Sequence, residues 1–506
     1  MQSIVDVGSS GIIIEVECHI SNGIPNIIIV GFANKAVDEA KERLRGAYTN
    51  ARLNLPRKRI TINLAPADMP KDSTSFDLAM AVAILNTSGQ IKLSPGKEDA
   101  FIGELGLDGQ VRPVRGIIGK ILSGRDLGIE NFYIPSENLQ QAQLIPEVTL
   151  LPIKHLHDLY LHLSRTTNLP EIKTGQGYDP QALETCKNAN ELVFDDIVGQ
   201  DLAKRGLEIV AAGGHNVLFN GPPGTGKSML ARALAELLPP LNHEEILEVT
   251  QLHSLASHDY DRIVTGRPFR SPHHSASDTA IIGGGQNPQP GEISLSHRGV
   301  LFLDEFPEFG RATIESLRQP LEEKSITVAR AETSIQYPAN FILVATANPC
   351  PCGYYGTSKT CNCLPHHIIR YQRKISGPII DRIDLHIPVE EVDHSRLLKN
   401  TDRQRSEKLK QHIARARQIQ AKRYNNSQKL NSDMTNKDIK KYARLTTPAK
   451  NILDSASEKL GISARGYMRT IKVSRTIADL DAREYITPSD ITEALQYRKQ
   501  NYQLQL

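Results

Sequence analysis

The feature that most limits the folds open to this 506-residue chain is a glycine-rich turn between a short apolar strand and a helix. The apolar run Asn216–Asn220 leads into the turn, and a helical pattern follows it directly. The residues of the turn are Gly221, Pro222, Pro223, Gly224, Thr225, Gly226, Lys227 and Ser228. Glycines let backbone N–H groups face a phosphate, and the helix start adds the positive end of its dipole. This order predicts a P-loop in an α/β domain.

A nucleoside triphosphate with Mg²⁺ is the ligand expected at this turn. We expect the Lys227 ammonium to reach the β- and γ-phosphates, and the Ser228 hydroxyl to ligate Mg²⁺. A second apolar strand, Gly299–Leu303, ends in two carboxylates, Asp304 and Glu305. Asp304 is predicted to hold Mg²⁺ through water, and Glu305 to act as the general base for the attacking water.

A third strand, Phe341–Ala345, leads to the neutral amide of Asn348. Because the carboxyl ends of parallel strands meet at one edge of a sheet, we expect Asn348 to orient water beside the γ-phosphate. The three strand ends together predict a complete ATP-hydrolysing site.

Four of the six cysteines lie within fourteen positions, at Cys350, Cys352, Cys361 and Cys363. Four thiolates in a tetrahedral array suit a structural Zn²⁺ ion. The C-x-C spacing is tighter than the common C-x-x-C knuckle, so a loop of unligated thiols stays open as an alternative. The small number of cysteines excludes a secreted disulfide scaffold.

The pattern along the chain predicts an α/β multidomain protein. Short β-branched runs at Gly11–Glu17, Ile27–Val30 and Arg59–Leu64 alternate with helical patterns at Lys35–Tyr48 and Phe76–Leu85. We predict an N-terminal α/β domain over residues 1–165, a linker over 166–192, a P-loop core over 193–392 and a helical lid over 393–506.

Charge and apolar content give a first indication of the partners and the location of the protein. The net charge is +3, but residues 401–450 hold fourteen Lys or Arg and four Asp or Glu, a local balance of 14 − 4 = +10. Such a segment attracts a phosphate backbone or forms a solvated helical face. The start of the sequence lacks a cationic leader, and no apolar stretch reaches the ~18 residues of a membrane span, so we expect a cytoplasmic protein without membrane contact.

Four longer motifs carry a resemblance to a known family. They are Arg267–His274, Pro290–Arg298, Asp304–Phe309 and Asn348–Gly353. With the P-loop they resemble the magnesium-chelatase-like branch of the AAA+ ATPases, and within it the YifB/ComM family of bacterial proteins. The resemblance covers essentially the whole chain. It implies a homo-hexameric ring that couples ATP hydrolysis to DNA translocation, as a branch-migration helicase in recombination during natural transformation.

The resemblance also assigns roles to two arginines. Arg382 matches the arginine finger that this branch inserts into the neighbouring subunit's site, and Arg465 matches the sensor-two arginine of the lid. A planar, permanently charged guanidinium suits both tasks. On residue pattern alone, a surface ion pair is the favoured interpretation of each arginine, so both roles depend on the resemblance.

We further predict DNA contacts by cations that face the channel of the ring. Five lie between the two phosphate motifs, and the sixth lies at the tip of an expected hairpin of Ser325–Ala329 and Thr333–Tyr337. They are Arg267, Arg270, His273, His274, Arg298 and Arg330. The alternative is that some of them, above all the two histidines, brace the subunit interface.

Residues 1–165 resemble the domain of the Lon protease, through Pro70–Leu78 and Gly109–Gly116. In that alignment Ser75 and Lys120 occupy the places of the catalytic Ser–Lys dyad. Phe76 and Asp77 replace the small residues expected beside such a serine, and this disfavours a tight nucleophile turn. We therefore favour a DNA-binding or ring-building role for this domain. An ATP-dependent protease and a magnesium-chelatase motor stay as alternatives to the DNA translocase.

Overall fold

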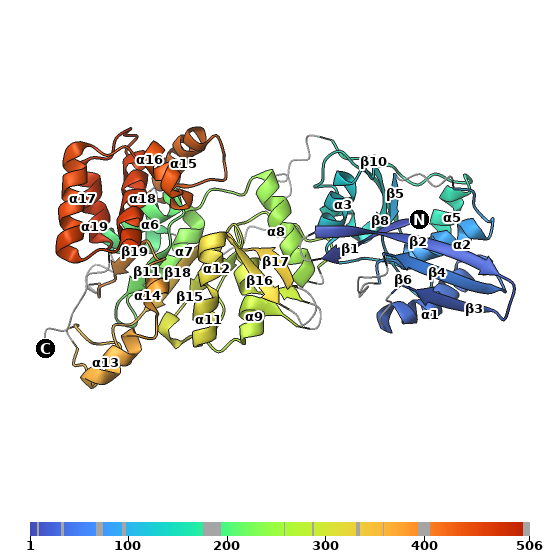
Figure 1. Ribbon diagram of the computed structural model, residues 1–506, viewed down its shortest axis with the longest axis horizontal. Coiled ribbons are helices and arrows are strands. Elements are labelled where there is room, and N and C mark those ends of the chain that lie inside the picture. Colours follow the sequence, from blue (N-terminus) through green and yellow to red (C-terminus); the bar gives the residue numbers. More distant parts are fainter. Residues whose placement is uncertain are drawn as a thin grey trace.

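The computed structural model describes residues 1–7, 10–31, 35–66, 74–93, 98–175, 194–257, 259–285, 288–329, 334–357, 359–392 and 405–498. An N-terminal α/β unit, a central α/β core and a helical lid follow one another along the molecule (Figure 1). The predicted α/β multidomain class is confirmed.

An eight-stranded sheet forms the centre of the N-terminal unit. Its strands are β1 (Gln2–Val7), β2 (Ser10–Ser21), β3 (Asn26–Val30), β4 (Arg59–Ala65), β5 (Asp99–Phe101), β8 (Asn131–Pro135), β9 (Thr149–Ile153) and β10 (Ile172–Lys173). The order is β10-β9-β8-β5-β1-β2-β4-β3. Strands β9, β8, β5 and β1 run parallel, whereas β1–β2 and β2–β4 are antiparallel pairs. The three strands predicted from the sequence are β2, β3 and β4.

Helices cover both faces of this sheet because side chains alternate along each strand. The helices are α1 (Lys35–Asn50), α2 (Asp77–Thr87), α3 (Ile117–Asp126), α4 (Leu139–Ala142) and α5 (Leu156–Leu163), and a small hairpin joins β6 (Glu104–Leu105) to β7 (Val111–Arg112). On β1, Ile4 packs into the apolar cluster that contains α3, whereas Val5 packs into the cluster that contains α2. The predicted helices match α1 and α2.

The central core has a five-stranded parallel sheet. Its strands are β11 (Val217–Asn220), β12 (Phe269–Arg270), β15 (Val300–Leu303), β18 (Ile342–Ala347) and β19 (Leu385–Pro388). The order is β12-β15-β18-β11-β19, and every neighbouring pair is parallel. All residues of β15 and β18 are buried, as expected for central strands covered on both faces. The three strands predicted beside the phosphate motifs are β11, β15 and β18.

Two apolar layers enclose this sheet, with the lid on one side. The helices of the core are α6 (Asp201–Gly213), α7 (Lys227–Leu237), α8 (His243–Ala256), α9 (Asp278–Ile282), α10 (Glu292–Leu295), α11 (Arg311–Ser316), α12 (Arg318–Glu323), α13 (Pro365–Gln372) and α14 (Gly377–Ile380). One cluster joins α6 and α7 to the lid, and the other joins α9–α12, α14 and a hairpin. That hairpin pairs β16 (Ser325–Ala329) with β17 (Ser334–Pro338), close to the predicted ranges.

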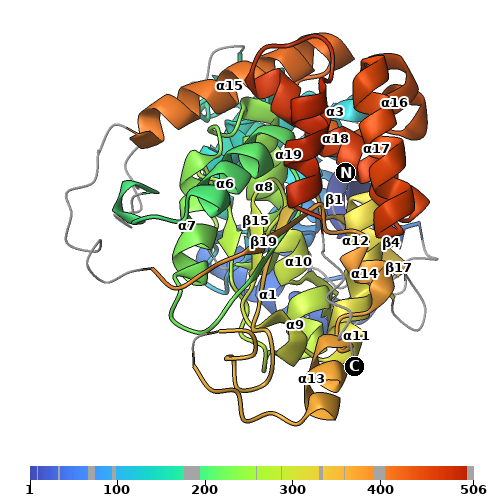
Figure 2. The same ribbon diagram turned by 90° about the vertical axis from the view of Figure 1, so that its left-hand side faces the viewer.

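The lid consists of helices stacked above the core (Figure 2). They are α15 (Arg405–Tyr424), α16 (Asn436–Tyr442), α17 (Thr447–Leu460), α18 (Ala464–Leu480) and α19 (Pro488–Gln496). Arg469 of α18 forms an ion pair with Asp384, which also accepts a hydrogen bond from the Asn216 backbone N–H at 3.1 Å. This contact fixes the lid to the edge where β11 and β19 begin.

Helix α8 joins the N-terminal unit to the core. Ile246 and Val249 of α8 belong to the same apolar cluster as α3. Beside it, Gln141 Nε2 donates to the Arg262 carbonyl oxygen at 2.9 Å. The two units are therefore packed together through an apolar contact with polar bonds at its side.

The segment between these units only partly coincides with the predicted linker over 166–192. Strand β10 lies inside that range and pairs with β9, so the N-terminal sheet extends past residue 165. Residues 176–193 lie outside the described part of the chain. Among the described residues, no helix combines the length and the apolar character that crossing a membrane requires.

Candidate nucleotide site

The P-loop leaves the carboxyl end of β11 and enters α7, as the sequence predicts. Gly224 and Gly226 have φ of +81° and +86°, the left-handed region that favours glycine. At Gly221 an added Cβ would lie 2.1 Å from the Val389 carbonyl oxygen, so only glycine fits there. Thr225 Oγ1 donates to the Pro222 carbonyl oxygen at 3.0 Å and closes the turn. The loop thus has a fixed backbone that a phosphate can approach closely.

Lys227 connects the P-loop to the sensor strand. Its Nζ donates to the carbonyl oxygens of Gly221 and Pro222 at 2.7 and 2.8 Å, and to Asn348 Oδ1 at 3.1 Å. Burial lowers the pKa of Lys227, and the nearby carboxylates of Asp304 and Glu305 oppose that effect. The predicted phosphate lysine and the predicted sensor amide therefore lie in contact.

The acidic strand end lies beside the P-loop serine. Ser228 Oγ donates to Asp304 Oδ2 at 3.3 Å. Thr346 Oγ1 donates to Asp304 Oδ1 at 2.6 Å and accepts from the Glu305 backbone N–H at 2.9 Å. A hydroxyl and a carboxylate oxygen at this separation are suitable ligands for Mg²⁺, directly or through water. Thr346, which is buried, was not predicted, and its place two residues before Asn348 at a strand end was the available signal.

Glu305, the second carboxylate after β15, has a left-handed backbone conformation. Its φ and ψ are +51° and +49°, and its side chain is half exposed. Non-glycine residues in this region are uncommon and occur often at functional sites. His274 Nδ1 lies 4.0 Å from Glu305 Oε2, and the ring also meets Phe309 edge-on. The predicted general base is therefore accessible to water and lies beside His274.

Arg382 lies at the opposite edge of the sheet from the P-loop. It precedes β19, and its carbonyl oxygen accepts from Asn216 Nδ2 at 3.3 Å, where β11 begins. Its guanidinium is almost buried, with Nη2 2.5 Å from Glu322 Oε1 and Nη1 donating to the Pro378 carbonyl oxygen at 2.6 Å. Glu322 was not predicted, because nothing in the sequence around it separates it from an ordinary helix-surface glutamate.

Arg465 lies near the same carboxylate. Its Nη2 is 4.0 Å from Glu322 Oε1, and its side chain is largely exposed. Hydrogen bonds from Arg382 lower the pKa of Glu322, and the charges of Arg382, Arg465 and Arg469 act in the same direction. The two predicted phosphate-facing arginines therefore stand together around one glutamate.

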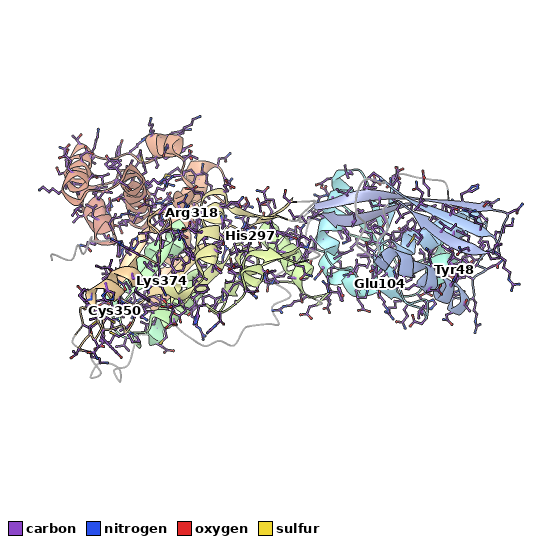
Figure 3. All side chains as sticks on the ribbon, turned by 60° about the horizontal axis from the view of Figure 1, so that its bottom comes forward. Tyr48, Glu104, His297, Arg318, Cys350 and Lys374 are labelled. Carbon is purple, nitrogen blue, oxygen red and sulfur yellow. The ribbon has the colours of Figure 1, made fainter. Side chains whose placement is uncertain are left out.

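The four cysteines of the predicted zinc site come together in one cluster. Their sulfur atoms all lie within 4.8 Å of one another. A hydrogen bond from the Tyr354 backbone N–H lowers the pKa of Cys352 to about 6, which favours a thiolate. Figure 3 places Cys350 and Lys374 at the end of the core that is remote from the N-terminal unit.

Two of the predicted DNA-contacting arginines are used inside the subunit. Arg267 binds Glu245 at 3.1 Å and donates to the Arg298 carbonyl oxygen at 2.7 Å. Arg298 binds Glu248 at 2.7 Å and also donates to Gln428 of the lid. Each side chain is 11% exposed. This placement favours a bracing role between α8, the core and the lid over a phosphate contact.

The other predicted cations differ in their surroundings. Arg270 forms an ion pair with Glu292 but stays about one-third exposed. The ring centroids of His273 and His274 lie 4.1 Å apart with the rings tilted by 33°, and His274 lies near Glu305. Arg330 follows β16 in the sequence and lies outside the described residues. Arg270 thus ends β12, and of the two histidines that follow it His274 lies beside Glu305 of the nucleotide site.

Many cations of the basic segment 401–450 are paired within the chain. Arg417 donates to the Ala211 carbonyl oxygen at 2.7 Å, and Arg423 forms an ion pair with Asp479. Lys429 lies 2.8 Å from Asp438. Part of the local positive charge therefore joins the lid to the core and to itself.

Ser75 and Lys120 are both buried inside the N-terminal unit. Ser75 Oγ lies 3.5 Å from the Ile4 carbonyl oxygen, and Lys120 Nζ donates to the Arg115 carbonyl oxygen at 2.8 Å. The carboxylate of Asp77, two residues after Ser75, binds Arg43 at 2.6 Å. With both side chains at most 1% exposed, neither is presented to a peptide from solvent in this conformation.

Comparison with known proteins matches all three parts of the chain. The family descriptions are "Subunit ChlI of Mg-chelatase" for residues 16–138, "Magnesium chelatase, subunit ChlI" for 193–397, and "Magnesium chelatase, subunit ChlI C-terminal" for 403–498. The competence protein ComM of Haemophilus influenzae is 42% identical over 97% of this chain and 96% of its own length. YifB of Escherichia coli is 40% identical over 96% and 94%. The magnesium-chelatase 67 kDa subunit of Chlorobaculum parvum is 31% identical over 31% and 23%.

The parallel core, the P-loop with its acidic strand end and these matches define a magnesium-chelatase-like AAA+ ATPase, a class that binds ATP and Mg²⁺. Similarity to ComM and YifB extends over nearly the full length of each protein. The chain belongs to the YifB/ComM family.

Proposed function

We propose that this chain hydrolyses ATP as one subunit of a homo-hexameric ring that moves DNA in the cytoplasm. The finer proposal is a branch-migration helicase that acts in recombination during natural transformation. The name of the Haemophilus relative, a competence protein, supports this direction.

The observation that carries the ring proposal is the separation of Arg382 from its own P-loop. The P-loop follows the carboxyl end of β11, whereas Arg382 contacts Asn216 at the amino end. Four strand residues span about 13 Å at ~3.3 Å each. This separation supports a ring in which a neighbouring subunit supplies the arginine, and the position of Arg465 near the same Glu322 carboxylate supports the same arrangement.

Within one site, each residue has a distinct proposed role. Lys227 binds the β- and γ-phosphates, and Ser228 with Asp304 holds Mg²⁺, which neutralises phosphate charge. Glu305 accepts a proton from the attacking water, and Asn348 orients that water. Thr346 holds the Asp304 carboxylate and the Glu305 backbone in place through its two hydrogen bonds.

A structural Zn²⁺ ion at Cys350, Cys352, Cys361 and Cys363 is the second cofactor that we propose. The support is the common position of the four sulfur atoms and the thiol chemistry of the set.

For DNA, we propose phosphate contacts from Arg270 and Arg330, with His273 and His274 beside them. Arg270 is a partly exposed guanidinium, and the sequence places Arg330 between β16 and β17, outside the described residues. We propose that Arg267 and Arg298 act as braces that hold this surface together, because their guanidinium groups are already bound to Glu245 and Glu248.

ATP turnover measured with different partners tests the proposed function. Single-stranded, duplex and four-way DNA are compared with a porphyrin-bearing partner protein and with unfolded protein. Stimulation that is largest with four-way DNA is expected. Stimulation only by the porphyrin partner, or only by unfolded protein with cleavage of that protein, would replace this proposal by a chelatase motor or a protease.

A further inference from the structure

The cysteine cluster has the dimensions of a metal site. Cys361 Sγ lies 3.7 Å from Cys350 Sγ and 3.6 Å from Cys352 Sγ. Four sulfurs at ~2.3 Å from a tetrahedral Zn²⁺ ion are about 3.8 Å apart, whereas a disulfide requires about 2.05 Å. The array therefore fits one soft divalent ion better than a pair of disulfides.

The loop is folded around Cys350 by its own backbone. The Tyr355 backbone N–H donates to Cys350 Sγ at 3.3 Å, and the Gly353 N–H donates to the Cys350 carbonyl oxygen at 3.0 Å. Gly353 and Gly356 have φ of +86° and +76°. These hydrogen bonds hold Cys350 in a fixed position beside the other three cysteines.

This loop also touches the nucleotide site. A Cβ added at Gly353 would lie 2.6 Å from Cδ of Pro223 in the P-loop. Two residues before Cys350, Asn348 accepts the hydrogen bond of Lys227. Between these two residues, the Pro349 carbonyl oxygen accepts a hydrogen bond from Gln372 Nε2 of α13 at 3.1 Å. The segment from Asn348 to the cysteines is thus held between the P-loop and α13.

We propose that metal binding by the four cysteines controls ATP turnover, by holding Gly353 against Pro223 and Asn348 against Lys227. The inference rests on the proposed ATP hydrolysis and adds a regulatory metal to it. Without the ion, the loop is free to leave Pro223, and the sensor amide loses its fixed position. Since a misplacement of about 1 Å can reduce a rate ~100-fold, such a loss lowers turnover more than nucleotide affinity.

Two glycines of the same loop give a matched pair of variants. Gly353→Ala places a methyl group against Pro223, whereas Gly356→Ala has the same left-handed strain but no atom within 4 Å of the new Cβ. Both full-length variants are measured for bound zinc and for ATP turnover. We expect about one zinc per chain in both, on four-thiolate stoichiometry, and a turnover at least about tenfold lower in Gly353→Ala than in Gly356→Ala.

Removal and return of the metal provide a second test on the unaltered protein. A thiol-competent chelator strips the ion, excess Mg²⁺ is restored, and a thermal melt monitors the fold. We expect turnover to fall in the stripped protein and to return with Zn²⁺. If protein verified as metal-free hydrolyses ATP at the original rate, the inference is overturned. Equal turnover of the two metal-loaded glycine variants overturns it as well. If Gly353→Ala does not retain zinc, the inference is tested by the removal and return of the metal in the unaltered protein.

A Lys227→Ala control separates this inference from the proposed ATPase. If that variant keeps the turnover of the unaltered protein, the proposed site is wrong. If turnover depends on Lys227 but not on the metal, only the regulatory inference fails.

Discussion

Lys227 Nζ donates a hydrogen bond to Asn348 Oδ1 at 3.1 Å, although 121 positions separate the two residues in the chain. The contact joins the P-loop directly to the end of the sensor strand. An incoming γ-phosphate competes for the same ammonium, because a charged phosphate oxygen is a stronger acceptor than an amide. We therefore expect nucleotide binding to release the Asn348 amide from Lys227, so that it can orient the attacking water while the loop that follows stays in place.

Two substitutions at the nucleotide site are expected to have different effects. Lys227→Ala removes the phosphate-binding ammonium, so we expect it to abolish tight nucleotide binding. Glu305→Gln keeps the binding groups but removes the proton acceptor, so ATP binds while turnover falls about 10²- to 10⁴-fold. Binding of a labelled nucleotide and phosphate release measure the two properties. Near-normal turnover in Glu305→Gln would remove Glu305 from its assigned role.

The part of this site that depends on local sequence could be predicted. The P-loop and the Asp304–Glu305 strand end are defined by a few adjacent residues whose backbone geometry follows from glycines and apolar strands. Thr346 and Glu322 could not be found in the same way, because their roles depend on side chains that meet from distant segments. For the same reason, sequence alone did not reveal that Glu245 and Glu248 bind Arg267 and Arg298.

The boundaries between the units could be predicted less well from the sequence than the units themselves. Strand β10 adds a short edge to the N-terminal sheet within a polar segment that has no hydrophobic period. Two-residue strands carry too few side chains to show an alternation. Helix α8 likewise packs against the N-terminal unit through contacts of Ile246 and Val249 with α3. Such contacts between distant segments cannot be predicted from a local sequence pattern.

Arg382→Ala is expected to lower ATP turnover by about 10³-fold or more while nucleotide binding stays largely intact. The reason is that its backbone lies at the sheet edge opposite its own P-loop, and its guanidinium binds Glu322 and the Pro378 carbonyl oxygen. Rings mixed from Arg382→Ala and Lys227→Ala subunits should recover some turnover, since one partner brings an intact P-loop and the other an intact arginine. A forced monomer that hydrolyses ATP at the normal rate would exclude action in trans.

Purified full-length protein is expected to carry about one zinc ion per chain, on the stoichiometry of a four-thiolate site. Cys361→Ser combined with Cys363→Ser should remove it, because two ligands cannot hold a structural ion. Cys18→Ser is the matched control, since Cys18 lies on β2 in the N-terminal unit. Elemental analysis after purification without chelator decides the point. If the unaltered protein carries no metal, the prediction is wrong and these cysteines are unligated thiols.

The ion pairs of α8 predict a pH-dependent contribution to stability. Burial by itself would raise the pKa of Glu248 above its ordinary value of 4.5, but hydrogen bonds from His297 and Arg298 lower it to about 2. A carboxyl group whose pKa is lower in the folded protein than in the unfolded protein stabilises the fold at pH values above its unfolded-state pKa. This stabilisation is lost as the pH falls toward the folded-state pKa. Glu248→Gln should therefore lower Tm at neutral pH, and the difference from the unaltered protein should shrink below about pH 4.5. Melting curves across this range measure it. A constant difference down to about pH 3 contradicts the prediction.

The last prediction separates DNA-contacting cations from bracing ones. Arg270→Ala and Arg330→Ala should weaken DNA binding similarly for all sequences, and the slope of log affinity against log salt should become shallower by ~0.7–0.9 per lost phosphate contact. Basal ATP turnover without DNA should stay close to normal in Arg330→Ala.

Arg298→Ala is the contrasting variant, because its guanidinium is 11% exposed and bound to Glu248 and Gln428. Its removal leaves the Glu248 carboxylate with fewer donors and loosens the lid, so Tm should fall by several degrees while the salt slope of the DNA complex stays unchanged. Fluorescence titrations at several salt concentrations, with melting curves alongside, measure both quantities. If Arg298→Ala changes the salt slope and Arg270→Ala does not, Arg298 contacts DNA and Arg270 acts as the brace. If neither Arg270→Ala nor Arg330→Ala alters DNA binding in an intact ring, these arginines do not contact the DNA backbone.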